Sequence, residues 1–487
     1  MTKKISFLIL GLIISILANS QNWTQIGSSI DGEFEGDYFS QSLSLNSDGS
    51  ILAVGAPWND ENGDNAGNVR VFQNNSGNWE QIGDNISGEI AGDKFGYSIG
   101  INSSGDIVAI GATQSSNGGT GYVKIYQNNS GTWEQIGDKI IGDNADDGFG
   151  KSISINDDGS IIAIGAPWND NIANSSGLVK IFQNNADTWE QIGETLYGNL
   201  YMDNYGNSVS LSGNGTILAI GVPSHDGGTG FGYTAIYQNI GGTWTQVGDN
   251  IDAENGGDMF GVSVSLNTAG SIVAIGGTWA NENNSGHVKI FQNIDDTWTQ
   301  MGNTINGETA NDYSGYSVSL NSDGNTIAIG SPWTVDYGNV RVFEYADNNW
   351  SQLGMNIEGS TVSDGFGCSI SLNSSGNIVA VGAESFDDIY NNAGQAKIFE
   401  NITTNINKIS KDFFIFYPNP TNGIVNFEFA ENNIKRVTVS DITGKQLIEI
   451  TEIQQNKQID LSGFDSGIYL INIQTNNEIF TTKIIKK

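Results

Sequence analysis

The chain is dominated by short runs in which apolar and polar positions alternate, separated by glycine, asparagine and aspartate. Serine and isoleucine alternate over residues 152–155, and an apolar run then ends at Ala163-Ile164-Gly165. After a polar loop, a further apolar run at 179–182 leads through a short turn to Trp189. Such period-two alternation between turn residues predicts β-strands, and the 3.6-residue period of a helix is absent. The pattern predicts an all-β protein with four short strands in each unit.

This unit recurs seven times along the chain. The motif Trp-x-Gln-apolar-Gly returns about every 52 to 56 residues, beginning at Trp23, Trp79, Trp133, Trp189, Trp244, Trp298 and Trp350. A second motif, close to aromatic-Gly-x-Ser-x-Ser-x-Asn, keeps the same register. It begins at Phe39, Phe95, Phe149, Tyr205, Phe260 and Phe366, and the sixth copy is altered to Ser314-Gly315. Repeats of four strands at this spacing predict a seven-bladed β-propeller.

The two ends of the repeat region complement each other. The last repeat ends at residues 396–399 without a Trp strand, whereas the first Trp strand, at Trp23, has no blade of its own. We expect residues 21–27 to complete the last blade, which would cover a strand edge that is otherwise open. The propeller is therefore assigned to residues 21–403.

Different segments flank the repeats. Residues 404–412 form a polar linker, and residues 413–487 hold short strands with turn signals, which predicts a small immunoglobulin-like β-sandwich. Residues 1–20 read as a secretory signal peptide, because Lys3 and Lys4 precede an apolar run and Ala18-Asn19-Ser20. That run is short for a membrane span, and no other stretch is apolar enough to be one. We expect an exported protein without a transmembrane segment.

Charge and composition exclude several classes of function. The 487 residues carry a net charge of −34, which argues against nucleic acid as a partner. Residues 404–487 hold nine acidic and nine basic side chains, so the negative excess lies in the propeller. One cysteine, two histidines and the lack of any nucleophile, zinc or phosphate-binding motif leave no candidate catalytic residue.

Two resemblances to known families follow from these motifs. Phe149-Gly150 followed by Gly165-Ala166-Pro167 resembles the FG-GAP repeat, whose best-known members form the integrin α-subunit propeller, and the likeness spans roughly residues 21–403. The C-terminal module resembles the type A sorting domain of bacterial type IX secretion. That resemblance implies recognition by the type IX machinery and a location at the cell surface or outside the cell. It rests on Tyr417, Pro418, Asn419, Pro420, Gly423, Gly444, Lys445, Gly467, Ile468, Tyr469, Lys483, Lys486 and Lys487.

The FG-GAP resemblance raises the question of calcium. Calcium-binding members carry Asp-x-Asp/Asn-x-Asp-Gly-x-x-Asp, but around Asp158-Gly159 the first ligand position is Ser154 and the last is Ile162. Calcium needs six to eight oxygens, so we expect a tight turn here and no cofactor. A weaker metal candidate is an aspartate two residues before the aromatic-Gly position, for which an Asx-type turn is the simpler role. This set is Asp37, Asp93, Asp147, Asp203, Asp258, Asp312 and Asp364.

Four tryptophans outside the repeat motif share one loop position: Trp58, Trp168, Trp279 and Trp333. Together with the adjacent Asn59, Asp60, Asn169 and Asp170, they are candidate ligand-binding residues. They could form an aromatic platform for a sugar ring or a protein, or pack against the neighbouring blade. The leading hypothesis is a secreted or surface-bound, non-enzymatic adhesion propeller for an extracellular protein or glycan. The alternatives are an extracellular polysaccharide-acting enzyme or its accessory subunit, and a structural surface-layer component.

Overall fold

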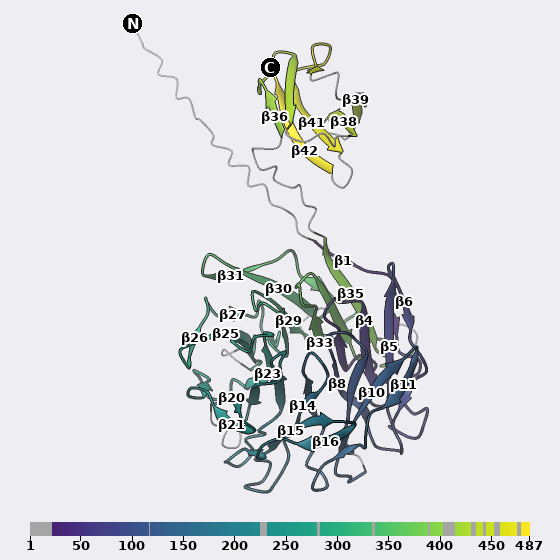
Figure 1. The fold of residues 1–487 in the computed structure, drawn as a ribbon, viewed down its shortest axis with the longest axis vertical. Helices are drawn as coiled ribbons and strands as arrows, with labels where there is room; N and C mark the ends of the chain where they lie inside the picture. The colour runs from purple at the N-terminus through teal and green to yellow at the C-terminus, as the bar shows by residue number, and fades with distance from the viewer. Residues whose placement is uncertain are drawn as a thin grey trace. The chain divides into compact units, whose positions relative to one another are not determined.

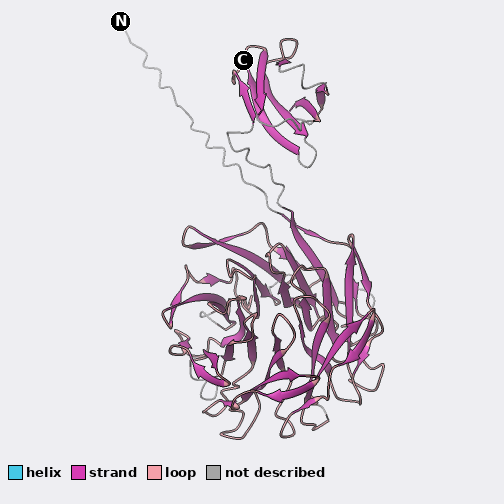
Figure 2. Ribbon diagram, in the orientation of Figure 1, coloured by secondary structure: helices cyan, strands magenta, loops and turns pink. Residues whose placement is uncertain are grey.

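The computed structural model describes residues 22–115, 117–224, 231–279, 283–333, 337–387, 390–402, 414–429, 435–441, 445–451, 458–474 and 479–487. These residues form strands and turns (Figure 2), and none of them belongs to a helix that could cross a membrane. Residues 21–402 form one compact unit, and the C-terminal residues belong to a second. The predicted signal peptide (1–20) and linker (404–412) lie outside the described residues.

The first unit is a ring of seven antiparallel sheets, which confirms the seven-bladed propeller (Figure 1). In each blade a first strand lies nearest the axis, and the second, third and outer strands follow outwards. The first strands of blades 1 to 7 are β3 (Ser42–Leu45), β8 (Phe95–Ile101), β13 (Ser152–Ile155), β18 (Ser208–Leu211), β23 (Phe260–Leu266), β28 (Ser317–Leu320) and β33 (Phe366–Leu372). The second strands are β4 (Ile51–Ala56), β9 (Ile107–Ala112), β14 (Ile161–Ala166), β19 (Ile217–Val222), β24 (Ile272–Gly277), β29 (Thr326–Ser331) and β34 (Ile378–Ala383).

The outer part of each blade differs from the expected four-strand pattern. The third strands are β5 (Asn68–Asn75), β10 (Tyr122–Asn129), β15 (Leu178–Asn185), β20 (Tyr233–Ile240), β25 (His287–Ile294), β30 (Asn339–Ala346) and β35 (Gln395–Ile402). The outer strands are β6 (Asn78–Gln81), β11 (Thr132–Gln135), β16 (Thr188–Gln191), β21 (Thr243–Gln246), β26 (Thr297–Gln300), β31 (Asn349–Gln352) and β1 (Asn22–Gln25). A fifth, two-residue strand also pairs with each third strand: β7 (Ile86–Ser87), β12 (Ile140–Ile141), β17 (Leu196–Tyr197), β22 (Ile251–Asp252), β27 (Ile305–Asn306), β32 (Ile357–Glu358) and β2 (Ile30–Asp31).

Blade 7 is built from both ends of the propeller sequence. Its outer strand β1 pairs antiparallel with β35, placing Trp23 opposite Asn401. The short strand β2 pairs with the same third strand, placing Ile30 opposite Ala396. The first strands of blades 7 and 1 also contact each other. Backbone hydrogen bonds within one sheet therefore close the ring.

The hydrophobic core consists of layers between neighbouring blades. One layer joins Ile125 of blade 2 to Ile162 and Ile164 of blade 3, all at most 1 % exposed. The aromatic residue of the second motif lies in these layers, and Phe149 belongs to this one. Because both faces of each second strand are covered, its sequence is almost continuously apolar. This burial explains the Ala-Ile-Gly runs.

Hydrogen bonds between blades explain the polar residues of both motifs. Each motif tryptophan donates its indole N–H to the preceding blade, as Trp79 does to the Ile26 carbonyl oxygen at 3.2 Å. The same bond recurs at Trp23, Trp133, Trp189, Trp244, Trp298 and Trp350. In the second motif, the first serine donates to the next blade, as Ser42 does to Gly96 O at 2.7 Å. The repeated motifs therefore join blades to one another.

The C-terminal unit contains two sheets. The first has three strands, β36 (Phe414–Tyr417), β37 (Ile424–Phe429) and β40 (Gln458–Asp460). The second has four, β39 (Gln446–Ile450), β38 (Arg436–Asp441), β41 (Gly467–Gln474) and β42 (Ile479–Lys486). Val425 of the first sheet and Val439 and Ile471 of the second are fully buried in one core. The unit is therefore a small β-sandwich, as the turn pattern predicted.

Candidate functional site

The loop that corresponds to the calcium loop of FG-GAP repeats forms a hairpin between first and second strands. In blade 3, Asp158 accepts a hydrogen bond from the Ser160 backbone N–H at 2.9 Å, and Gly159 has a φ of +78°. The first ligand position, Ser154, instead accepts the backbone N–H of Leu211 in the next blade at 2.9 Å. The last position, Ile162, is completely buried. Both positions therefore carry contacts that hold the blades together.

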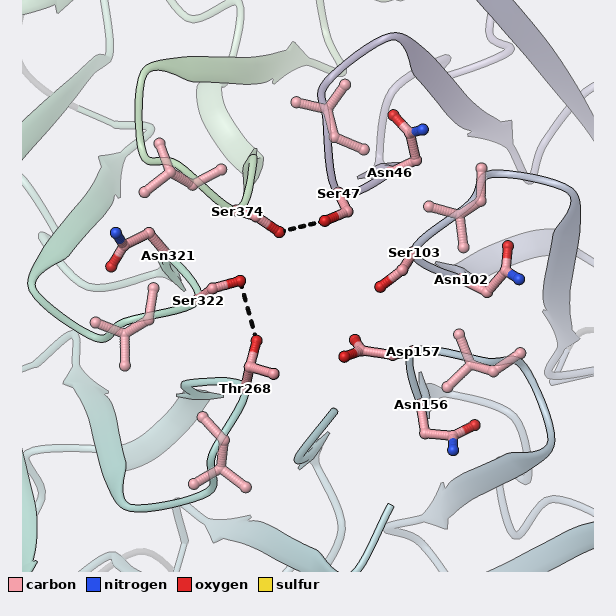
Figure 3. A pocket seen from close by; sticks show the side chains of 16 residues that line it. Asn46, Ser47, Asn102, Ser103, Asn156, Asp157, Thr268, Asn321, Ser322 and Ser374 are labelled. Carbon is pink, nitrogen blue, oxygen red and sulfur yellow. Dashed lines mark hydrogen bonds between the residues drawn. The ribbon is translucent and has the colours of Figure 1, made fainter. Parts of the chain in front are cut away.

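The tips of these hairpins form a ring around one end of the central channel (Figure 3). The backbone N–H of Ser47 donates to Ser103 O, Ser103 N–H donates to Asp157 O, and the series continues round all seven blades. The ring is completed through Gly213, Thr268, Ser322 and Ser374, whose N–H donates to Ser47 O at 2.9 Å. The sequence contains no signal for this ring, because the bonds depend on closure of the propeller.

The seven repeated aspartates are buried, with exposures of at most 5 %. Asp93 accepts hydrogen bonds from the backbone N–H groups of Glu89 and Ile90 and from the side chains of Gln114 and Tyr122. Asp203 and Asp312 each accept two backbone N–H groups in the same way. Burial raises the pKa of Asp37, Asp147, Asp258 and Asp364. These carboxylates order the loop that leads into each blade.

The acidic residues upstream of these aspartates pair with a basic residue of the third strand. The pairs are Arg70–Glu33 at 3.5 Å, Lys124–Glu89 at 2.8 Å, Lys180–Asp143 at 2.7 Å, Lys289–Glu254 at 2.6 Å and Arg341–Glu308 at 3.9 Å. In blade 4 the two positions are Ala235 and Asn199, so both charges are absent together. Blade 7 departs from this rule, because its lysine is kept and Lys397 donates to the Ser360 hydroxyl at 3.1 Å. Covariation in the other six blades is the signal by which the pairs could have been predicted. Within the described ranges, no three Asp, Glu, His or Cys side chains gather as a metal site.

The four loop tryptophans lie at the opposite end of the blades. We call this end the loop face: it comprises the second-to-third strand loops and the connections between consecutive blades. Trp279 and Trp333 are 56 % and 43 % exposed, whereas Trp58 and Trp168 are half-buried. The loop face also carries most of the other large exposed apolar side chains of the described propeller, including Phe34, Ile172, Phe231 and Tyr390. A ligand would therefore meet apolar surface here.

Residues from three consecutive blades surround Trp58 and Trp168. The Trp58 ring lies 5.1 Å from that of Tyr38 and 6.2 Å from that of Tyr97, with Lys94 Nζ 5.2 Å from its centroid. Lys151 Nζ lies 5.4 Å from the Tyr97 ring and 5.8 Å from the Trp168 ring. We name Trp58, Lys94, Tyr97, Lys151 and Trp168 the cationic aromatic cluster. Its parts are far apart in sequence and meet because adjacent blades present equivalent loops.

The indole of Trp168 packs closely against Gly148, which lies in the segment directly before blade 3. A Cβ added at Gly148 would lie 2.5 Å from the indole, so only glycine allows this approach. Gly148 also has a φ of +68°, which glycine adopts without strain. The indole therefore has a defined position.

A second aromatic group lies in blade 6. The Trp333 ring stands nearly perpendicular to Tyr313 at 5.8 Å and to Tyr316 at 4.6 Å. Tyr97, Lys151, Tyr316 and Cys368 occupy equivalent positions near the start of their first strands, so they lie around the channel at the loop face. Burial raises the pKa of Tyr316, of the Cys368 thiol and of the nearby Glu384 carboxyl. Aromatic and titratable groups therefore gather at this channel mouth.

The polar neighbours of the tryptophans hold the loops in place. Asn59 and Asn169 are at most 1 % exposed, and their amides donate to Asp37 at 3.1 Å and to Asp147 at 2.5 Å. The exposed Asp60 accepts the N–H of Asn65, and Asp170 accepts that of Ser175. A buried amide cannot contact a ligand without rearrangement, so within each Trp-Asn-Asp sequence the tryptophan and the aspartate are the accessible groups.

Comparison with known proteins agrees with this architecture. Residues 30–72 match the family model of the FG-GAP repeat, and residues 415–487 match that of the secretion system C-terminal sorting domain. The match to the FG-GAP repeat therefore lies mainly in blade 1 of the propeller, and the C-terminal unit is a secretion sorting domain. The sorting domain indicates export by type IX secretion to the cell surface or the extracellular space, as the sequence predicted.

Two further comparisons add little about the propeller's activity. No curated protein matches the sequence. Among solved structures, one similar protein is from Bacteroides uniformis ATCC 8492, provisionally assigned as a 6-phosphogluconolactonase. The two are 12 % identical with a TM-score of 0.48, over 66 % of this chain and 87 % of that one.

The motif residues of the sorting domain serve its fold in several ways. Asn419 donates to Lys483 O at 2.9 Å and accepts the N–H of Ile485 at 3.0 Å, which ties the loop after β36 to β42. Tyr469 is buried, and its hydroxyl donates to Asp465 O at 2.6 Å. Lys486 is also buried and donates to the carbonyl oxygens of Ser462 and Phe464.

The remaining sorting residues lie at turns or on the surface. A Cβ added at Gly423 would lie 2.5 Å from Ser462 Oγ, and Lys445 donates its backbone N–H to Asp441. Tyr417 and Ile468 are 43 % and 47 % exposed. Pro418, Pro420, Gly467 and Lys487 are also described, whereas Gly444 lies outside the described residues. The exposed side chains are those that the secretion machinery could contact directly.

Proposed function

We propose that this secreted FG-GAP propeller is a non-enzymatic binding protein whose loop face holds an extracellular glycan or protein. The observation that carries the proposal is the grouping of aromatic side chains on that face. Trp58 and Tyr97 belong to adjacent blades and lie within 6.2 Å of each other, and Trp279 and Trp333 are exposed. Partly exposed aromatic rings with a fixed orientation suit the apolar face of a sugar or an apolar anchor of a protein.

The contacts of the repeated carboxylates favour binding over hydrolysis. Glycoside hydrolysis by the usual route requires two carboxyl groups that flank one bond. The seven repeated aspartates are buried and bonded within their loops, and five of the upstream positions are held in ion pairs. Seven equivalent carboxylates do not single out one pair that could flank a glycosidic bond, so they do not support a catalytic role.

The proposal is tested by glycan-array and surface-extract binding with the variant Trp58→Ala/Trp168→Ala/Trp279→Ala/Trp333→Ala. The matched control is Ile240→Ala/Ile294→Ala, because both isoleucines are more than half exposed and lie at the opposite end of the blades. We expect the tryptophan variant to lose binding at least tenfold while the control retains it. If both variants bind equally well and unfold at the same temperature as the wild type, the loop face is not the binding surface.

A further inference from the structure

Two lysines on the loop face have no carboxylate partner in the described structure. Residues 21–403 contain nine basic residues: Arg70, Lys94, Lys124, Lys139, Lys151, Lys180, Lys289, Arg341 and Lys397. Five of the third-strand residues among them form the ion pairs described above, and Lys139 pairs with Glu89 at 2.6 Å. Among the described residues, the Lys94 ammonium group donates only to the Ser115 hydroxyl, at 3.3 Å, and the Lys151 ammonium group has aromatic rings but no hydrogen-bond or ion-pair partner beside it. Both belong to the cationic aromatic cluster.

This arrangement is unusual for such an acidic protein. The chain carries 54 acidic and 20 basic residues, so a lysine that lacks a counter-charge is the exception. Lys94 is partly buried, and burial alone lowers its pKa, without an opposing contribution from any carboxylate. Aromatic faces attract an ammonium group, but this attraction is weaker than a charge-assisted hydrogen bond to a carboxylate. The ammonium groups of Lys94 and Lys151 can therefore still pair with an anionic ligand.

The aromatic members define what kind of anion fits. Trp58 and Trp168 lie at the two ends of the cluster, with Tyr97 and Lys151 between them, and the cluster spans blades 1 to 3. A compact inorganic anion could pair with a lysine but would leave the aromatic rings unused. A chain of sugar rings could stack on successive aromatic faces and direct its acidic substituents to the lysines between them.

We propose that the cationic aromatic cluster binds an acidic oligosaccharide, in which the carboxylates of uronic acid residues pair with Lys94 and Lys151. This inference rests on the proposed binding function and narrows its ligand class. Carboxylates more than about 8 Å away are largely screened at physiological salt. Those in the adjoining loops are already engaged: Asp93 is buried and accepts hydrogen bonds from Gln114 and Tyr122, and Asp60 and Asp170 accept backbone N–H groups of their own loops. Binding should weaken as salt is raised, since the lysine–carboxylate pairs are partly exposed to solvent.

The test compares acid and neutral forms of the same sugar chains by isothermal titration calorimetry with the full mature chain. The probes are four-residue oligomers of galacturonate, mannuronate and glucuronate, each beside its methyl ester, which removes the charge and preserves the ring. We expect at least one acid form to bind at least tenfold more tightly than its ester. Lys94→Gln and Lys151→Gln should each weaken binding of that acid form about fivefold to tenfold and leave the ester unchanged.

Control variants separate the failure of this inference from that of the proposed function. Lys139→Gln removes the same charge from the same face outside the cluster and should have no effect; Lys151→Arg should preserve the preference for the acid form. The inference is overturned if the wild-type protein binds no acid oligomer more tightly than its methyl ester. It is also overturned if both glutamine variants still bind the acid form more tightly than the ester. If Trp58→Ala/Trp168→Ala nevertheless abolishes sugar binding, the proposed function stands. If neither the tryptophan nor the lysine variants change any binding, both fail.

Discussion

Gly100 interrupts a regular row of hydrogen bonds between first strands. In six blades the second serine of the motif accepts a backbone N–H of the next blade, as Ser154 does from Leu211 at 2.9 Å and Ser44 from Ile101 at 3.4 Å. The others are Ser210, Ser265, Ser319 and Ser371. Blade 2 has Gly100 at this position, and among the described residues the equivalent N–H, that of Ile155, has no acceptor in the neighbouring blade. We predict that Gly100→Ser stabilises the propeller.

The structure allows the magnitude to be worked out in two parts. A hydrogen bond of this kind contributes a net of about 0.5–1.5 kcal/mol. Replacing a strand glycine contributes roughly 0.5–1 kcal/mol more through the unfolded chain. A new Cβ would lie 3.2 Å from Ile155 Cγ2, which is a tight contact and offsets part of the gain. The variant Gly100→Ala has the same Cβ without the hydroxyl, so the difference between the serine and alanine variants isolates the hydrogen bond.

Hydrogen–deuterium exchange measured by mass spectrometry, together with urea unfolding, checks this prediction. We expect the unfolding free energy of Gly100→Ser to exceed that of Gly100→Ala by about 1 kcal/mol. Peptides that contain Ile155 should exchange about fivefold more slowly in the serine variant, if the amide opens locally. Conversely, Ser154→Ala should expose the Leu211 amide to faster exchange. If the serine and alanine variants are equally stable and exchange at the same rate, the serine row does not secure the blade edges.

Three further predictions follow from the propeller. His287 is 5 % exposed, and burial lowers its pKa to about 4, so the unfolded chain binds a proton between about pH 6.5 and pH 4 that the folded chain does not. The free energy of unfolding should therefore fall by about 3 kcal/mol as pH falls through this window. The variant His287→Leu, which has the residue found at the equivalent position of blade 3, Leu178, lacks this proton; in urea unfolding, its free energy of unfolding should fall by about 3 kcal/mol less over the same pH range. Trp23→Ala should destabilise the propeller by about 2–4 kcal/mol, and more than Trp189→Ala, because only Trp23 also closes the ring; equal melting temperatures for the two variants would contradict this. Calcium added after chelation should leave the melting temperature unchanged, because the positions of two usual ligands carry Ser154 and Ile162; a rise would reveal a cation site.

The propeller could be predicted from the sequence because the same pattern of apolar, polar and glycine positions recurs in seven copies. Trp79 and its equivalents had to pack against the core at a fixed place in each blade, and the apolar run through Ile162 and Ile164 had to be a strand covered on both faces. The two-residue fifth strands escaped prediction, since a pair such as Ile86–Ser87 is too short to show alternation. Its pairing depends on the third strand alongside it.

The candidate site was less predictable because it is made by contacts between blades. Trp58 and Trp168 share a loop position with Trp279 and Trp333, yet the first pair is half-buried and the second is exposed. Their exposure depends on what the neighbouring blade presents: Tyr97 stands beside Trp58, and Lys151 lies over Trp168. A repeat motif describes what blades share, whereas these contacts come from the residues in which they differ.

The strand pairing in blade 7 imposes an order on folding. Strand β1 (Asn22–Gln25) is among the first parts of the propeller to be synthesised, and its partner β35 (Gln395–Ile402) is the last. The ring therefore cannot close until almost all of the propeller has been made, and contacts between such distant residues form slowly. Until then the third strand of blade 7 is missing or has an unpaired edge, which invites association with other chains. A chain that stops before residue 395 would remain permanently in that open state, so an intact ring is itself evidence that translation passed through strand β35.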